Sequence, residues 1–159
     1  MAYRLWLLAH LCGVVAFLGT FVLGFVSKTL AERSKDRAAV AHAFIAIRFG
    51  DRWIMPPAIG TMVLSGIMLA GRAGLPLLGT AWIFWSAILL GFSGAVFVLR
   101  VNPLQQRLEQ STGESVTEAF DWASYRPAAR SWLIWAALAF AANLGAMALM
   151  VLKPDLPGP

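Results

Sequence analysis

The sequence predicts an all-α fold: a four-helix transmembrane bundle with amphipathic connecting helices on its cytoplasmic side. Apolar residues make up 59% of the 159-residue chain and charged residues only 13%, about half the usual charged share of a soluble domain. Four stretches reach or approach the roughly 20 apolar residues that cross a bilayer. We therefore predict a single integral membrane domain over residues 1–159. Its spans are expected at about 5–26, 53–70, 80–99 and 131–152.

The first span contains no formally charged residue and one histidine, His10. A titratable ligand group in hydrocarbon is costly and marks a functional site by default. At the helical rise, His10 lies about 7–8 Å inside the outer end of this span. Gly13 and Phe17 follow on the same helical face. A glycine one turn from a ligand histidine leaves room for a flat macrocycle, although the same glycine also serves helix packing.

The second span is the shortest, and a charged segment precedes it. The apolar side chains of that segment share one helical face: Val40, Phe44 and Ile47. We expect an amphipathic helix that lies on the membrane or extends the second span. Pro56 and Pro57 are tolerated in a first helical turn, and Asp51 suits a positive helix N-terminus. The span is therefore expected to begin near Trp53 with a kink.

The second connection is short and rich in glycine, which predicts an antiparallel pair of spans two and three. The third connection is longer. Asn102 and Pro103 predict a helix start, with asparagine as the cap and proline as the first helical residue. Ser115 and Glu118 have capping-box spacing and predict a second short helix that ends near Pro127.

Small residues recur at every fourth position in three spans. They are Ala16, Thr20 and Gly24 in the first, Ala87, Gly91 and Ala95 in the third, and Ala137, Ala141 and Gly145 in the fourth. Such faces let helices approach closely in lipid. They predict a compact bundle.

Basic residues indicate the topology. Ten of the 13 Lys and Arg residues lie in the first and third connections. The positive-inside rule then places these connections in the cytoplasm and both termini outside. Since the basic residues flank apolar spans, the net charge of +5 indicates a lipid bilayer rather than nucleic acid as partner. The four predicted spans contain no carboxylate, lysine or arginine, which argues against an ion-coupled transporter.

A histidine at membrane depth can ligate haem or a metal ion, relay a proton, or hydrogen-bond a neighbouring helix. His42 is predicted on the opposite side, so His10 and His42 of one chain are not expected to share a haem. Met147 lies near the depth of His10 and could supply a second axial ligand. Asn143 could line a cofactor or quinone pocket, or hydrogen-bond another helix.

The outer-half methionines offer an alternative. Met68 and Met150 join Met147 and His10 at a similar depth, and such soft ligands suit Cu(I). Methionine also fills gaps in membrane cores without binding anything.

The chain resembles a bacterial family of four-helix integral membrane proteins of unknown function. The features that carry the resemblance run in order along the chain: LLAHLCGVVAFLGT, Asp51-x-Trp53-x-x-x-Pro57, Leu64-Ser65-Gly66, LLGTAWIFW, PLQQRL and LMVLKP. The family is distantly similar to the copper-resistance D type and the HemJ-type protoporphyrinogen oxidases. In these a first-helix histidine recurs, and in the HemJ type it is associated with haem.

The resemblance implies a location in the bacterial inner membrane and a haem b site at His10. The HemJ type also relies on a lysine in its third helix, and residues 80–99 contain none. We therefore expect a haem-associated or redox-linked membrane protein with His10 as axial ligand, and leave enzymatic activity open. Two alternatives remain: a non-catalytic protein that assembles with a membrane partner or a second copy, and copper handling through His10.

Overall fold

The computed structural model describes residues 1–113 and 120–157, and these residues contain no strand. They form four long helical rods. The rods are α1 (Ala2–Ser34); α2 (Arg37–Phe49), η1 (Gly50–Ile54) and α3 (Met55–Arg72) in series; α4 (Ala81–Val96), η2 (Phe97–Val101) and α5 (Asn102–Gly113) in series; and α6 (Trp122–Leu152). Each rod is long and apolar enough to cross a membrane. The predicted all-α fold with four membrane-crossing helices is confirmed.

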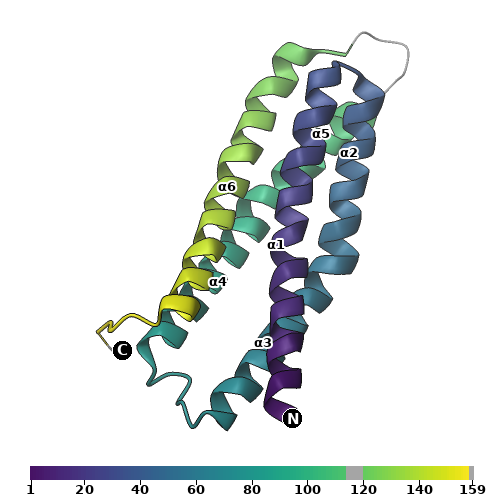
Figure 1. Cartoon of the computed structure of the whole chain (residues 1–159). Coiled ribbons are helices and arrows are strands. Elements are labelled where there is room, and N and C mark those ends of the chain that lie inside the picture. Colours follow the sequence, from purple (N-terminus) through teal and green to yellow (C-terminus); the bar gives the residue numbers. More distant parts are fainter. Residues whose placement is uncertain (114–119, 158–159) are drawn as a thin grey trace.

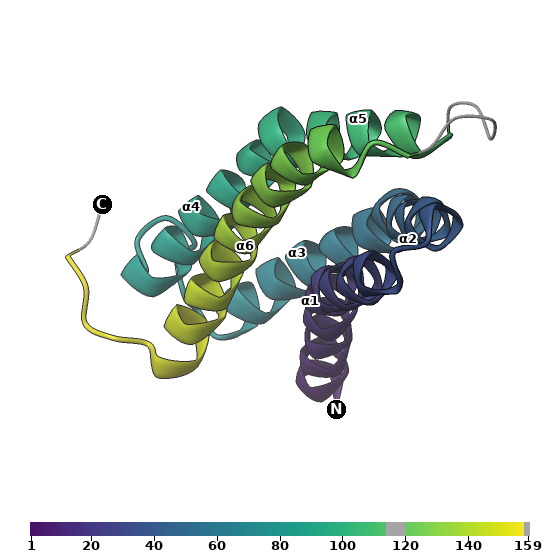
Figure 2. The same ribbon diagram turned by 90° about the horizontal axis from the view of Figure 1, so that it is seen from above.

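The rods are arranged as two pairs, α1 with α3 and α4 with α6 (Figures 1 and 2). Within the described residues, no Cα atom of α3 comes within 8 Å of one in α4 or α6. The pairs diverge toward the end that carries both chain termini, here called the terminal end (Figure 1). They meet toward the opposite end, here called the extended end, where α2 packs on α1 and α5.

The helices continue well past the predicted spans at the extended end. α1 has 33 residues and is about 50 Å long, against a hydrocarbon thickness of about 30 Å. It ends where Lys35 takes the left-handed conformation, with φ 53°, and Asp36 then caps α2 through the N–H of Ala38. α2 runs directly toward α3, so the amphipathic segment extends the second span.

The two internal helix starts predicted near proline coincide with the beginnings of α3 and α5, but neither is a free helix end. Pro56, Pro57 and Pro103 lie inside continuous rods, each just beyond a π-helical segment. A proline lacks the N–H that the carbonyl four residues back would receive, and its ring crowds that carbonyl. Widening of the preceding turn relieves the crowding, so the N–H of Met55 bonds to Gly50 O and that of Asn102 to Phe97 O.

The beginning of α6 also differs from the prediction. The helix begins at Trp122, capped by the Asp121 carboxylate, which accepts from the N–H groups of Ala123 and Ser124. Pro127 therefore lies inside α6 and does not follow the end of a shorter helix. The expected capping box at Ser115 and Glu118 lies outside the described residues.

Most members of the small-residue faces predicted for spans three and four do not lie at the helix contacts, although Gly145 does, with its Cβ position 3.4 Å from Cδ1 of Leu89 on α4. The exposed members are Ala87, Gly91, Ala95, Ala137 and Ala141, whereas Gly24 of span one is buried. The buried faces carry Ser86 and Ser93 on α4, and Ala136, Ala139 and Asn143 on α6. Polar side chains inside a membrane need partners, and this need selects the face that meets the other helix.

Candidate functional site

His10 lies on α1 against α3, near the terminal end. Its Nδ1 is 2.8 Å from the carbonyl oxygen of Met62, and the Ser65 hydroxyl lies 3.4 Å from the same nitrogen. Because a carbonyl only accepts, Nδ1 must carry the hydrogen, which leaves a lone pair on Nε2 of the neutral ring. Nε2 makes no hydrogen bond with the described residues and is not sealed in the interior. Histidines that ligate metals or haem usually have their other ring nitrogen held in this way.

Glycines set how closely α1 and α3 approach around His10. A Cβ on Gly13 would lie 2.8 Å from the backbone nitrogen of Met62, and one on Gly66 would lie 3.2 Å from Cε1 of His10. The space beside Gly13 is therefore filled by the α3 backbone and not left for a macrocycle. Phe17 is buried and packs edge-on against Phe21, with ring centroids 5.6 Å apart.

The other residues predicted around His10 lie on the second helix pair. Asn143 is buried and donates to the Ser93 hydroxyl at 2.8 Å, which ties α6 to α4. Met147, on the same helix, is 41% exposed. α6 meets α1 deeper in the bundle, where the ring of Phe140 packs on Phe21. One chain thus brings together His10, Gly13 and Phe17, but not Asn143 or Met147.

His42 lies far from His10, on the exposed surface of α2. Its Nδ1 is 2.8 Å from the carbonyl of Ala38, one turn back on the same helix. In the part of the chain that the structure describes, no three His, Cys, Asp or Glu side chains converge on a common point.

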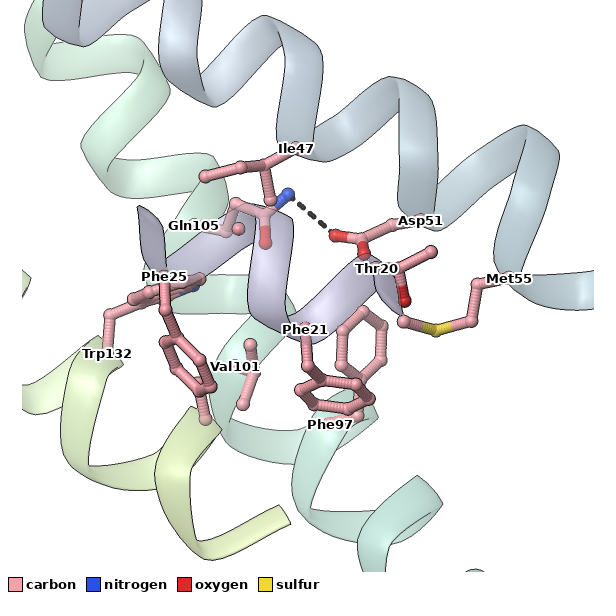
Figure 3. Close-up of a pocket in the computed structure, with 12 residues that line it drawn as sticks. Thr20, Phe21, Phe25, Ile47, Asp51, Met55, Phe97, Val101, Gln105 and Trp132 are labelled. Atoms are coloured by element: carbon pink, nitrogen blue, oxygen red, sulfur yellow. Dashed lines mark hydrogen bonds between the residues drawn. The ribbon is translucent and has the colours of Figure 1, made fainter. Parts of the chain in front are cut away.

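A buried polar centre joins the two pairs, and the sequence did not predict it. Nε2 of Gln105 on α5 donates to the Asp51 carboxylate of η1 at 3.0 Å (Figure 3). Gln105 and Trp132 are each 3% exposed, yet Oε1 of Gln105 and Nε1 of Trp132 have no partner among the described residues. Both side chains line a cavity of about 20 Å³ where the π-helical segments meet.

Two groups without a partner in the described part of the chain belong to residues that line this cavity: the acceptor Oε1 of Gln105 and the donor Nε1 of Trp132. The cavity volume holds about one water molecule, and a water can accept from Trp132 while donating to Gln105. Asp51 makes no ion pair within 4 Å with any described residue. Asp51 lies outside the predicted spans, two residues before the second one, in the continuous helical rod Arg37–Arg72.

A signal for this centre was present in the spacing of α5. Val101, Gln105 and Leu108 follow one another at i, i+4 and i+7, and all three are buried. Gln105 thus occupies a buried position between two apolar ones. A polar residue at an apolar period marks a buried hydrogen bond.

A second polar group closes the extended end. Lys28 is only 4% exposed, and its Nζ lies 2.7 Å from the Glu32 carboxylate and 5.7 Å from the ring centre of Trp132. The Tyr125 hydroxyl donates to the same carboxylate at 2.8 Å. These contacts tie α1 to the first turns of α6.

Comparison with known proteins identifies the family. The family model described as "Predicted integral membrane protein (DUF2269)" matches residues 4–154. The chain belongs to this family. No curated protein and no solved structure matches the chain. The family description confirms an integral membrane protein and, with it, a lipid bilayer as its surroundings.

Proposed function

We propose that this protein binds haem b through Nε2 of His10 in a redox-linked role. The hydrogen bond from Nδ1 to Met62 O carries the proposal, because it fixes the ring and its tautomer and leaves Nε2 available. Haem b held in this way supplies one-electron redox chemistry.

We propose that a second ligand of the haem would come from outside the chain. Asn143 and Met147 lie on the other helix pair, and Gly13 is covered by α3. His10 of a second copy would give bis-histidine ligation between subunits. His10 and His42 of one chain do not provide it, because they lie toward opposite ends of the bundle.

We place the protein in the bacterial inner membrane with both termini outside. Support comes from the loop charges, since ten of the 13 Lys and Arg residues lie in connections at the extended end. The extended end then faces the cytoplasm, and His10 lies in the outer half of the bilayer.

The test compares two histidine variants after expression with ample haem. Wild-type protein and His42→Ala should show the same Soret band, whereas His10→Ala should lose most of it. His42 is the matched control, because its Nδ1 also bonds a carbonyl at 2.8 Å but at the other end of the molecule. Colourless wild-type protein, or a Soret band unchanged in His10→Ala, would contradict the proposal. Stoichiometric copper instead of haem would favour copper handling through His10 and the methionines.

Assembly with a membrane partner or a second copy is the second candidate function. One observation favours it: α1 and α3 make no close approach to α4 within the described residues, and apolar side chains are exposed along all four rods. Co-purification of a stoichiometric partner without haem would support it. A monomer without partner that binds haem would contradict it.

A further inference from the structure

One face of the first turns of α6 borders a surface hollow of about 450 Å³ that is widely open to its surroundings. Five residues line it: Arg126, Pro127, Arg130, Ser131 and Ile134. These residues belong to the beginning of α6, which lies at the extended end (Figure 1). The hollow is separate from His10 and from the polar centre at Gln105.

The two arginines of this hollow have no partner among the residues that the structure describes. Arg126 and Arg130 are exposed, one helical turn apart, and neither makes a hydrogen bond, ion pair or ring contact with a described residue. Some of the other basic side chains of the same end do have partners: Lys28 pairs with Glu32, Arg48 pairs with Glu109, and Arg100 stacks on Trp135. Like charges at i and i+4 repel each other and destabilise a helix. An anion between the two arginines would relieve this repulsion and would also accept hydrogen bonds from both side chains.

The surface next to the arginines is apolar. Ile134 is 56% exposed and Leu138 40% exposed, and Ala137 and Ala141 on the same side of α6 are exposed as well. These residues continue from Arg130 along the helix toward the terminal end.

We propose that this surface binds one anionic phospholipid. The guanidinium groups of Arg126 and Arg130 hold its phosphodiester, with the Ser131 hydroxyl as a further donor. An acyl chain lies along Ile134 and Ala137. A basic pair directly beside an exposed apolar stripe matches a lipid, in which the phosphate is joined to hydrocarbon, better than it matches a free anion.

The experiment uses full-length protein in a neutral detergent, titrated with phosphatidylglycerol and observed by native mass spectrometry. The double variant Arg126→Gln/Arg130→Gln should bind the lipid about thirtyfold more weakly than wild type. The control Arg33→Gln/Arg107→Gln removes the same charge from exposed arginines of the same end that lie outside the hollow, and should bind as wild type does. Phosphatidylcholine should bind the wild type more weakly than phosphatidylglycerol.

Three outcomes would overturn the proposal: equal weakening in both double variants, equal binding of the two lipids, or displacement of phosphatidylglycerol by millimolar inorganic phosphate. A third variant, Ile134→Gln, tests the acyl contact. It should weaken phosphatidylglycerol binding while Arg126 and Arg130 remain, and unchanged binding would contradict the predicted course of the acyl chain. Circular dichroism of each variant confirms that α6 is folded.

Discussion

The two helix pairs are held together by different means. α1 and α3 approach through glycine, with the Cβ position of Gly13 only 2.8 Å from the α3 backbone. α4 and α6 are joined by side-chain hydrogen bonds, from Asn143 to Ser93 at 2.8 Å and from Ser86 to the carbonyl of Ala146 at 3.1 Å. Steric fit thus dominates one pair and polar pairing the other.

This difference has a consequence for tolerance to mutation. Lipid does not drive apolar helices together, so each pair depends on its own close contacts. A backbone contact cannot move aside, whereas a hydrogen bond between side chains can be lost while the helices stay packed. The α1–α3 pair should therefore be the more sensitive of the two.

The largest effect is expected for Gly13→Leu. The new side chain must displace the backbone of α3 at Met62 and Ala58, so we expect a loss of about 3 kcal/mol in the free energy of unfolding, at the upper end of overpacking costs. Gly19→Leu is the control, because nothing lies within 4 Å of its Cβ position. Unfolding in mixed micelles followed by circular dichroism measures both. Equal midpoints for the two variants would show that the α1–α3 pair is not closed by glycine.

A smaller effect is expected for the polar pair. Asn143→Ala and Ser93→Ala each remove the same interhelical hydrogen bond, so the double variant should show a coupling energy of about 0.6 kcal/mol. The same unfolding assay supplies the four free energies of the cycle. Strictly additive effects would mean that this bond does not hold α4 to α6.

Almost no effect is expected on the outer face of the second pair. Ala87 and Gly91 are exposed, so Ala87→Leu and Gly91→Leu should each change the free energy of unfolding by less than about 0.5 kcal/mol. A marked loss of stability, or a change of oligomeric state in detergent, would show that this face meets another helix after all.

The smallest effect is expected on the stability of the first turn of α6, compared with that of α1. Hydrogen bonds from the Ser124 side chain and from the N–H groups of Ala123 and Ser124 lower the pKa of Asp121 below the ordinary 3.8. A lowered pKa in the folded state contributes stability above pH 4 that is lost as the pH falls through the folded value. α1 has no side-chain cap.

In the wild type, the first turn of α6 should open more readily as the pH falls and Asp121 is protonated. Asp121→Asn should remove this pH dependence, and hydrogen exchange of the amides in that turn measures it. The first turn of α1 should show no corresponding pH dependence in either protein. An unchanged pH dependence in Asp121→Asn would mean that the carboxylate does not set the stability of this turn.

Apolar runs and charge predicted the four helices and the amphipathic extension. The continuity of the rods through Pro56 and Pro103 was missed, because proline is best tolerated in a first helical turn and the sequence does not show that a π-helical turn accommodates it here. The charged residues that follow the first span also gave no sign of how far α1 continues. Lys28 is buried in the helix, where it contacts Glu32 and Trp132.

The sequence predicted neighbours for His10 but not the buried centre at Gln105. Helical spacing put His10, Gly13 and Phe17 on one face of α1, and His10 and Gly13 do lie against α3, but a role for these residues around a cofactor stays a prediction. Depth alone suggested Met147 and Asn143 as neighbours, but two residues at one depth can belong to different helix pairs. Asp51 and Gln105 are 54 positions apart, and only the pairing of the two proline-containing rods brings them together.

Because the rods are unbroken, a force applied to the extended end is transmitted to the part that crosses the membrane. No loop separates the part of α1 that is long enough to cross hydrocarbon from the part that stands beyond it. A rigid rod cannot tilt at one end alone, so a sideways push on the extended end acts as a torque within the bilayer. The π-helical segments at Asp51 and Phe97 are the points where two of the rods change pitch, and there such a lever would flex first.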